Sequence, residues 1–272
     1  MTEEEKYLFD LQGYVVVQEA VSADLLCRLN RAIDETEELS DDEVAKRGFP
    51  RDYISSDNKY ALKGRADGAG LGDYGCKILP YGGPFEELID LPTTIPLVDE
   101  MIGEPCRLDA VAFLSRHNHG AFRFHHGYAE LLPYSEYAYD NDGFKCVSVK
   151  ISFALTDVDV EDGCFAVIPG SHKSAFTNPL VGKVPDSDHP LVEPIPCRAG
   201  DAVIFSEDLS HGAVENVRDN VRRTLFYSYA PAFHCPWKGF LEMAPGFSER
   251  STPERRQLVD GPPPFPEVLV DA

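Results

Sequence analysis

The spacing of hydrophobic positions changes about a third of the way along the chain. In the first third, an apolar stripe after Ser22 recurs at helical spacing, and serine favours the N-termini of helices. The stripe consists of Leu25, Leu26, Leu29 and Ile33. It predicts a helix that follows a short strand at residues 13–17. A second helix is predicted over about residues 94–101, where Gly103 is placed to end it.

From Cys106 onward, short runs of β-branched and aromatic residues alternate with turn residues. These runs cover residues 108–115, 145–155, 164–168, 202–205 and 222–230. Asp162-Gly163 lies between two runs and predicts a hairpin, and residues 198–201 predict another turn. Many short strands after a helical first third predict a mainly β, α+β fold. We expect one antiparallel barrel or sandwich buttressed by N-terminal helices.

The domain organisation is expected to be simple. No internal repeat, low-complexity tract or Gly/Ser linker divides the 272 residues, so we expect a single domain. It should comprise a helical N-terminal part with loops (1–104), a barrel core (105–232) and an irregular, proline-rich tail (233–272). Within the first part, residues 40–92 are acidic and weakly periodic, and we expect them to be mostly loop.

Composition and charge exclude several classes of function. The formal net charge of −21 disfavours nucleic acid and anionic membranes as partners, because both require a cationic surface. Apolar runs fall far short of the roughly 20 residues that a membrane helix needs. The acidic N-terminus resembles neither a signal nor a transit peptide, and the 7 scattered cysteines contain no CxxC pair. We therefore expect a cytoplasmic protein without disulfides or structural zinc.

Histidines supply the candidate chemistry. His125 and His126 follow the first predicted barrel strand, and His211 follows the strand at residues 202–205. Two imidazoles at the ends of different strands can converge on one metal ion, and imidazole suits iron, zinc, copper and nickel. The histidines alone do not distinguish such a site from ordinary surface or buried structural residues.

Five segments together resemble the phytanoyl-CoA dioxygenase family of the iron(II)/2-oxoglutarate-dependent oxygenases. These segments are residues 9–26, 151–158, 162–173, 199–205 and 222–229. Each segment is a weak signal, whereas their order and spacing are specific and span nearly the whole chain. The resemblance implies a double-stranded β-helix, which is a jelly-roll or cupin-like barrel. It also implies Fe(2+) as cofactor, with 2-oxoglutarate and O2 as cosubstrates.

The resemblance also implies roles for individual residues. In the family, an H-x-D motif and a distal histidine bind the iron, and His125 and His211 match the two histidines. The family's arginine for the distal carboxylate of 2-oxoglutarate lies eleven residues after the distal histidine, which corresponds to Arg222. Arg223 should point to the opposite face of the same strand.

The metal motif departs from the family at one position. Gly127 stands where the aspartate is expected, so His125 and His211 would be the only protein ligands. An H-x-G or H-x-A motif is found in the aliphatic halogenases of this superfamily, where chloride occupies the vacant position. Water or a returning Glu130 could fill the position instead. The motif therefore leaves chlorination and hydroxylation open.

The function expected from the sequence is oxidation of an unactivated C–H bond in a small molecule, as a hydroxylase or a halogenase with an atypical two-histidine iron site. The rival is a non-catalytic barrel that binds a metal or ligand. Aromatic residues between 128 and 144 could form a lid over the site or pack as an ordinary loop. The sequence identifies neither the substrate nor the oligomeric state.

Overall fold

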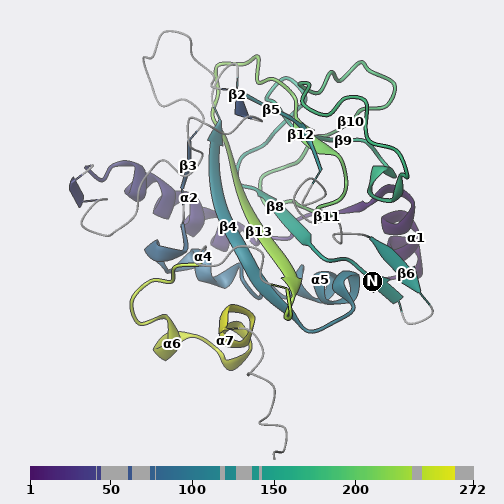
Figure 1. Cartoon of the computed structure of the whole chain (residues 1–272). Coiled ribbons are helices and arrows are strands. Elements are labelled where there is room, and N and C mark those ends of the chain that lie inside the picture. Colours follow the sequence, from purple (N-terminus) through teal and green to yellow (C-terminus); the bar gives the residue numbers. More distant parts are fainter. Residues whose placement is uncertain are drawn as a thin grey trace, which may run out of the picture.

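The computed structural model describes residues 1–40, 42–43, 61–62, 74–76, 78–116, 120–126, 137–140, 143–234 and 241–260. These residues form two antiparallel sheets and a small ribbon (Figure 1). The larger sheet has the order β1 (Tyr14–Val17), β11 (Ala202–Ser206), β8 (Val149–Ala154), β13 (Arg222–Pro231), β4 (Cys106–Arg116) and β3 (Tyr74–Cys76). The smaller has the order β10 (Glu193–Ile195), β9 (Phe165–Val167), β12 (His211–Ala213), β5 (Ala121–His125) and β2 (Ala61–Leu62). The ribbon pairs β6 (Ala138–Asp140) with β7 (Gly143–Lys145). The predicted mainly β, jelly-roll architecture is thus confirmed.

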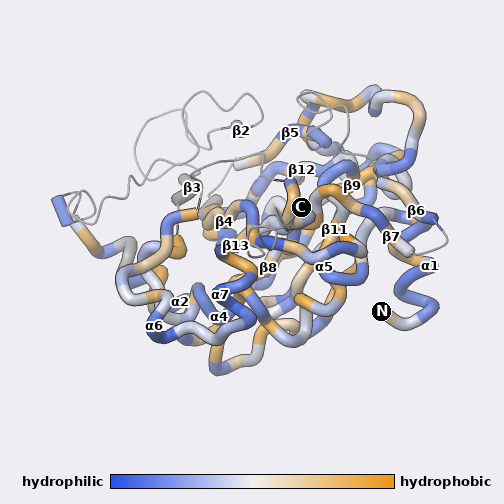
Figure 2. Tube along the Cα trace, turned by 60° about the horizontal axis from the view of Figure 1, so that its bottom comes forward, coloured by the Kyte–Doolittle hydropathy of each residue, from blue (hydrophilic) through white to orange (hydrophobic). Residues whose placement is uncertain are grey.

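Helices flank this framework. They are α1 (Glu3–Gln12), α2 (Ala23–Glu37), α4 (Pro84–Glu87), α5 (Ile95–Ile102), α6 (Phe247–Arg250) and α7 (Pro253–Asp260), with 3-10 turns η1 (Leu79–Tyr81) and η3 (Ser171–Lys173). Figure 2 shows α1 as a largely hydrophilic segment at the edge of the molecule, and Phe9 is its one buried residue. No helix in the described ranges combines the length and the apolar character needed to cross a membrane.

The helices pack on the outer face of the larger sheet. Leu25, Leu29 and Ile33 of α2 are buried there, as the helical stripe predicts, in one cluster with Ile151 and Phe153 of β8. The predicted end of α5 is also confirmed. Gly103 adopts a left-handed conformation with φ 68°, and a Cβ at this position would lie 2.1 Å from the carbonyl oxygen of Phe144. Only glycine fits there.

The inner face of the larger sheet is different in character. Because side chains alternate along a strand, Lys150, Ser152 and Ala154 of β8 lie opposite to the helix-facing side chains. A second apolar cluster, which includes Phe165 and Phe205, joins residues of the two sheets. The space between the sheets therefore combines aromatic packing with polar side chains, and the candidate site lies there.

Two expectations from the sequence were wrong. Asp162-Gly163 does not close a hairpin, because β8 pairs with β11 and β13 whereas β9 pairs with β10 and β12. The glycine, at φ 77°, instead lies on the path that carries the chain from one sheet to the other. The predicted turn at residues 198–201 is confirmed by the hydrogen bond from Asp201 N to Arg198 O (3.0 Å).

The second wrong expectation concerns the C-terminal tail, which was predicted to be irregular. It is not irregular throughout, since α6 and α7 occupy residues 247–250 and 253–260. Arg255 Nε lies 2.7 Å from Asp90 Oδ1, and Arg250 pairs with the buried Glu86 of α4. Pro253 is compatible with this helix because it is the first residue of α7, a position where its missing N–H costs nothing. The prolines at 262–264 and 266, on which the prediction rested, lie outside the described residues.

Candidate metal centre

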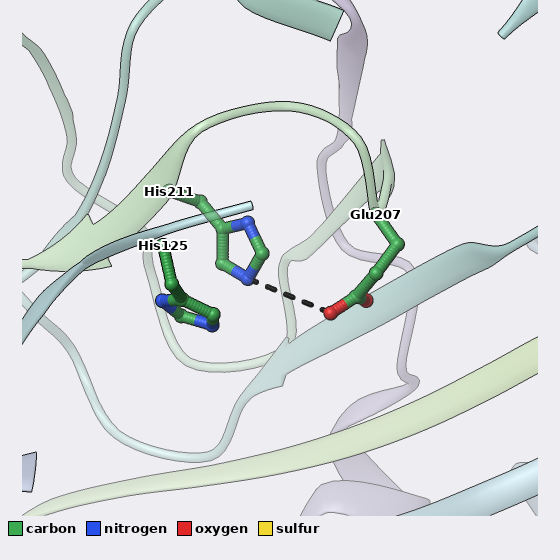
Figure 3. A group of neighbouring side chains, drawn as sticks. All are labelled: His125, Glu207 and His211. Carbon is green, nitrogen blue, oxygen red and sulfur yellow. Dashed lines mark ion pairs between the residues drawn. The ribbon is translucent and has the colours of Figure 1, made fainter. Parts of the chain in front are cut away.

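Adjacent strands of the smaller sheet bring His125 and His211 together. His125 is the last residue of β5 and His211 the first of β12, and the two are direct partners across the strand pair. Their ring centroids lie 4.1 Å apart at an interplanar angle of 55° (Figure 3). The sequence placed these histidines on different strands that converge, and the structure has this arrangement.

Backbone carbonyl groups orient both rings. His125 Nδ1 lies 3.1 Å from Arg123 O, and His211 Nδ1 lies 2.7 Å from Leu209 O. A carbonyl oxygen can only accept, so each Nδ1 carries the proton and donates it. Each Nε2 then keeps its lone pair, the form in which imidazole binds a metal ion.

Burial keeps both imidazoles neutral. It is the main cause that lowers the pKa of His125 well below its usual range, and electrostatic coupling to the adjacent His211 adds to the effect, because two neighbouring imidazoles resist being protonated together. Burial, assisted by the positive charge of Lys150, lowers the pKa of His211 to about 3. At neutral pH each ring therefore already has an unprotonated Nε2, so no proton must leave before the ring binds a cation.

Glu207 completes a three-residue cluster. It lies in the turn between β11 and β12, and its Oε1 is 3.9 Å from His211 Nε2. One ligand atom from each of His125, Glu207 and His211 lies within 4.8 Å of the other two. Figure 3 shows the ring of His125 beside the ring of His211, whereas Glu207 lies on the same chain segment as His211 and turns its carboxylate toward that ring. Two imidazoles and one carboxylate are the donor set of non-haem iron(II) oxygenases.

Aromatic side chains surround the histidines. Phe122 lies 4.9 Å from the ring of His125, and Phe205 and Phe165 lie 4.8 and 5.7 Å from the ring of His211, measured between ring centroids. Apolar neighbours exclude water and strengthen electrostatic interactions within the site.

Arg222 lies in the interior, apart from this cluster. It begins β13 and is 5% exposed, its Nε donates to Thr224 Oγ1 at 3.2 Å, and its Nη1 donates to Gly163 O. A cavity of about 10 Å³ lies beside it, and Phe165, which also packs on His211, lines that cavity. Arg223 points the other way and pairs with Asp34 of α2 at 2.7 Å. The two arginines therefore occupy opposite faces, as strand alternation predicts.

Several predicted residues fall in ranges that are not described. Gly127, the proposed vacant position, lies outside the described residues, as does Glu130, the alternative ligand. Of the aromatic residues considered as a lid, Tyr137, Tyr139 and Phe144 are described. Tyr137 packs on His172 with ring centroids 4.6 Å apart, and Phe144 packs on Phe9 of α1 at 5.2 Å. The hydroxyl of Tyr137 donates to Asp10 of α1. Tyr137 thus contacts η3 and α1.

Glu207 was not predicted from the sequence as a member of the site. The residue stands four positions before His211, but acidic residues number 46 in this chain, and nothing in its sequence context marks this one as buried. Its spacing from His211 was the one available signal.

Comparison with known proteins finds a match to one family. Residues 107–224 match the family described as Phytanoyl-CoA dioxygenase (PhyH). The matched stretch includes His125, Glu207, His211 and Arg222.

Curated relatives and solved structures are also similar to parts of this chain or to its fold. The chain is 32% identical over 113 residues to dioxygenase trt7 of Aspergillus terreus, which covers 42% of this chain and 37% of the relative. The match thus spans little more than a third of that protein. HygX from Streptomyces hygroscopicus, in a structure with nickel, 2-oxoglutarate and hygromycin B bound, is similar over 88% of this chain and 90% of its own, with a TM-score of 0.66 and 22% identity. The epimerase SnoN, in complex with Fe3+, alpha ketoglutarate and nogalamycin RO, is similar over 93% and 96% of the two chains, with a TM-score of 0.59 and 21% identity.

Proposed function

We propose that this protein is an iron(II)- and 2-oxoglutarate-dependent oxygenase that oxidises an unactivated C–H bond of a small molecule. The observation that carries the proposal is the pair of neutral imidazoles, His211 buried and His125 half-buried, whose Nδ1 atoms are held by backbone carbonyl groups, with Nε2 left to bind metal. The match of residues 107–224 to the PhyH family, and the iron and 2-oxoglutarate bound in similar structures, support it.

The residues present fit a metal ion of this kind. The two imidazoles suit iron, and Glu207, directly beside His211, adds a hard oxygen donor. With 2-oxoglutarate and O2, the bound iron would supply the oxidising power to remove a hydrogen atom from carbon. The protein would position the ligands through the carbonyl groups of Arg123 and Leu209, and Phe165 and Phe205 would shield the centre from water.

Arg222 is the proposed partner for the distal carboxylate of 2-oxoglutarate. A buried guanidinium offers a planar pair of donors to a carboxylate. The adjacent cavity of about 10 Å³ has room for about one water molecule. We therefore expect the side chains that line it to move apart when the diacid binds.

The substrate is proposed to be a small polar molecule. A cavity of about 380 Å³ is lined by His126, Asp208 and Ser210, each adjacent in sequence to a member of the metal cluster, although His125, Glu207 and His211 do not line it themselves. This volume falls in the range of small-molecule sites. Serine, lysine and asparagine side chains of residues 171–178 supply further polar groups to its wall. HygX, whose fold is similar, has hygromycin B bound in its structure.

The test is a screen of small molecules with Fe(2+), 2-oxoglutarate and O2, read by succinate release and by the product's mass. We expect substrate-dependent succinate and a product that has gained one oxygen atom or lost two hydrogen atoms. The matched control is His211→Ala, which should release no succinate. Succinate release by His211→Ala equal to that of the wild type would refute the assignment of the site.

A further inference from the structure

Within this proposed function, the identity of the third metal ligand decides which reaction follows. Gly127 offers no side-chain donor, and the carboxylate nearest to both histidines in the described structure belongs to Glu207. We propose that Glu207 is the third, anionic ligand of the metal ion, so that the carboxylate lost at Gly127 is replaced from the strand connection that precedes His211.

The backbone of Glu207 is held in place. Its N–H donates to Ser148 O at 3.0 Å, and the next residues close a turn through Leu209 N and Ser206 O at 2.9 Å. Asp208 N also donates to Ser206 Oγ at 3.3 Å. A carboxylate on a fixed turn beside His211 has little conformational freedom to lose when it binds a cation.

The side chain of Glu207 lacks a partner for one oxygen. The residue is 7% exposed, its Oε1 accepts from Lys150 Nζ at 2.7 Å, and its buried Oε2 has no hydrogen-bond partner among the described residues. A buried carboxylate oxygen without a partner is costly, because water is lost and nothing replaces it. A cation between Glu207 and the two histidines would satisfy it.

The distances suit this role. Metal bonds to imidazole nitrogen and carboxylate oxygen are about 2.0–2.2 Å long, so two ligand atoms lie roughly 3 Å apart at a right angle and at most about 4.4 Å apart. The 3.9 Å from Glu207 Oε1 to His211 Nε2 falls within this range, and rotation of the carboxylate would let one oxygen face the metal ion while the other keeps the contact with Lys150. The ligand atoms of His125, Glu207 and His211 all lie within 4.8 Å of one another. Only small side-chain movements would therefore bring all three to bonding distance from one metal ion.

The alternative is that Glu207 serves only as the ion-pair partner of Lys150. That pair gives Oε1 a partner but leaves Oε2 without one among the described residues. It also does not account for the two neutral imidazoles beside the carboxylate, because neutral rings do not balance its charge. If Glu207 occupies the anionic position, chloride has no reason to bind there. The inference therefore favours transfer of oxygen, or loss of hydrogen, over chlorination.

The test measures metal binding directly. Anaerobic calorimetric titration with Fe(2+), and with Co(2+) as a spectroscopic probe, is applied to wild type, Glu207→Gln, Glu207→Asp and Lys150→Met. We expect Glu207→Gln to lose at least about a hundredfold in affinity, beyond the roughly 10–100-fold typical of substitutions outside the ligand set. Glu207→Asp keeps a carboxylate, so its metal affinity should lie between those of the wild type and Glu207→Gln. Lys150→Met should not weaken metal binding, because it removes a positive charge near the ion.

Glu86→Gln is the matched control. Glu86 is also a buried glutamate in an ion pair, with Arg250, but it lies on α4 rather than between the sheets. Its substitution should change thermal stability and leave metal affinity unchanged. Glu130→Ala should likewise retain the affinity of the wild type.

Chloride provides a second readout. Titrating chloride into the Co(2+) forms should shift the visible spectrum of Glu207→Ala, where the anionic position is open, and leave that of the wild type unchanged. A chloride-dependent shift in the wild type, or wild-type metal affinity in Glu207→Gln, would overturn the assignment of Glu207 while leaving the oxygenase proposal intact. A wild-type protein that takes up neither metal would overturn both.

Discussion

Replacing Arg222 with leucine tests the proposal that this side chain binds the distal carboxylate of 2-oxoglutarate. The guanidinium is 5% exposed and its Nη1 and Nε donate to Gly163 O and to Thr224 Oγ1, so its position is fixed between the sheets. Arg223, the next residue, faces α2 and pairs with Asp34, whose side chain is 58% exposed. The two adjacent arginines therefore differ in environment but not in charge, which makes Arg223→Leu the matched control.

The expected magnitudes follow from this difference in burial. Loss of one partner from a buried charge pair costs roughly 3–5 kcal/mol, because the remaining charge is left unpaired. At about 1.4 kcal/mol for each tenfold change, Arg222→Leu should raise the Kd of 2-oxoglutarate between about a hundredfold and a few thousandfold. Arg223→Leu removes an ion pair with a solvent-exposed partner, worth about 0–1 kcal/mol of folding stability, and should leave this Kd unchanged.

The assay is anaerobic titration of 2-oxoglutarate into each metal-loaded variant, with thermal unfolding measured in parallel. Arg222→Leu also leaves the carbonyl group of Gly163 without this donor, so we expect a loss of about 1–3 kcal/mol in unfolding free energy. Arg222→Lys keeps the charge without the planar pair of donors, and should bind 2-oxoglutarate with intermediate affinity. A larger loss of affinity in Arg223→Leu than in Arg222→Leu would refute the assignment.

Two further predictions concern histidines. His125→Ala and His211→Ala should each abolish stoichiometric Fe(2+) binding measured by titration, whereas His189→Ala should retain it; uptake of one equivalent by either of the first two would contradict the site. Burial lowers the pKa of His172 to about 4, so between about pH 6.5 and 4 the unfolded chain binds a proton that the folded chain does not. The unfolding free energy should therefore fall with decreasing pH in this window, by up to about 1.4 kcal/mol per pH unit from this residue, and His172→Phe should reduce that slope in denaturant titrations. An unchanged slope would show that His172 does not contribute.

Local patterns in the sequence predicted much of the framework. The stripe that includes Leu25, Leu29 and Ile33 predicted a helix and its buried face, because a helix packed on one side must repeat its apolar residues at that period. Strand alternation likewise predicted that Arg222 faces inward and Arg223 outward, as the structure shows. Such features depend on neighbours within one element, which the sequence displays directly.

Features that depend on contacts between distant elements could not be predicted in this way. Asp162-Gly163 has the composition of a hairpin, but β8 finds its partners in β11 and β13, and nothing within the turn reports this. Glu207 resembles any acidic residue of a turn until Lys150 of β8 and His211 of β12 are brought beside it. The position of this carboxylate beside His211 could therefore be recognised only from the tertiary structure.

The most direct test of the oxygenase account is the visible absorption spectrum recorded when Fe(2+) and 2-oxoglutarate are added together under strictly anaerobic conditions. The account predicts a weak metal-to-ligand charge-transfer band in the wild type, which requires both reagents and is absent from His211→Ala. No band in a folded, metal-loaded wild-type protein, or a band of equal strength in His211→Ala, would contradict it.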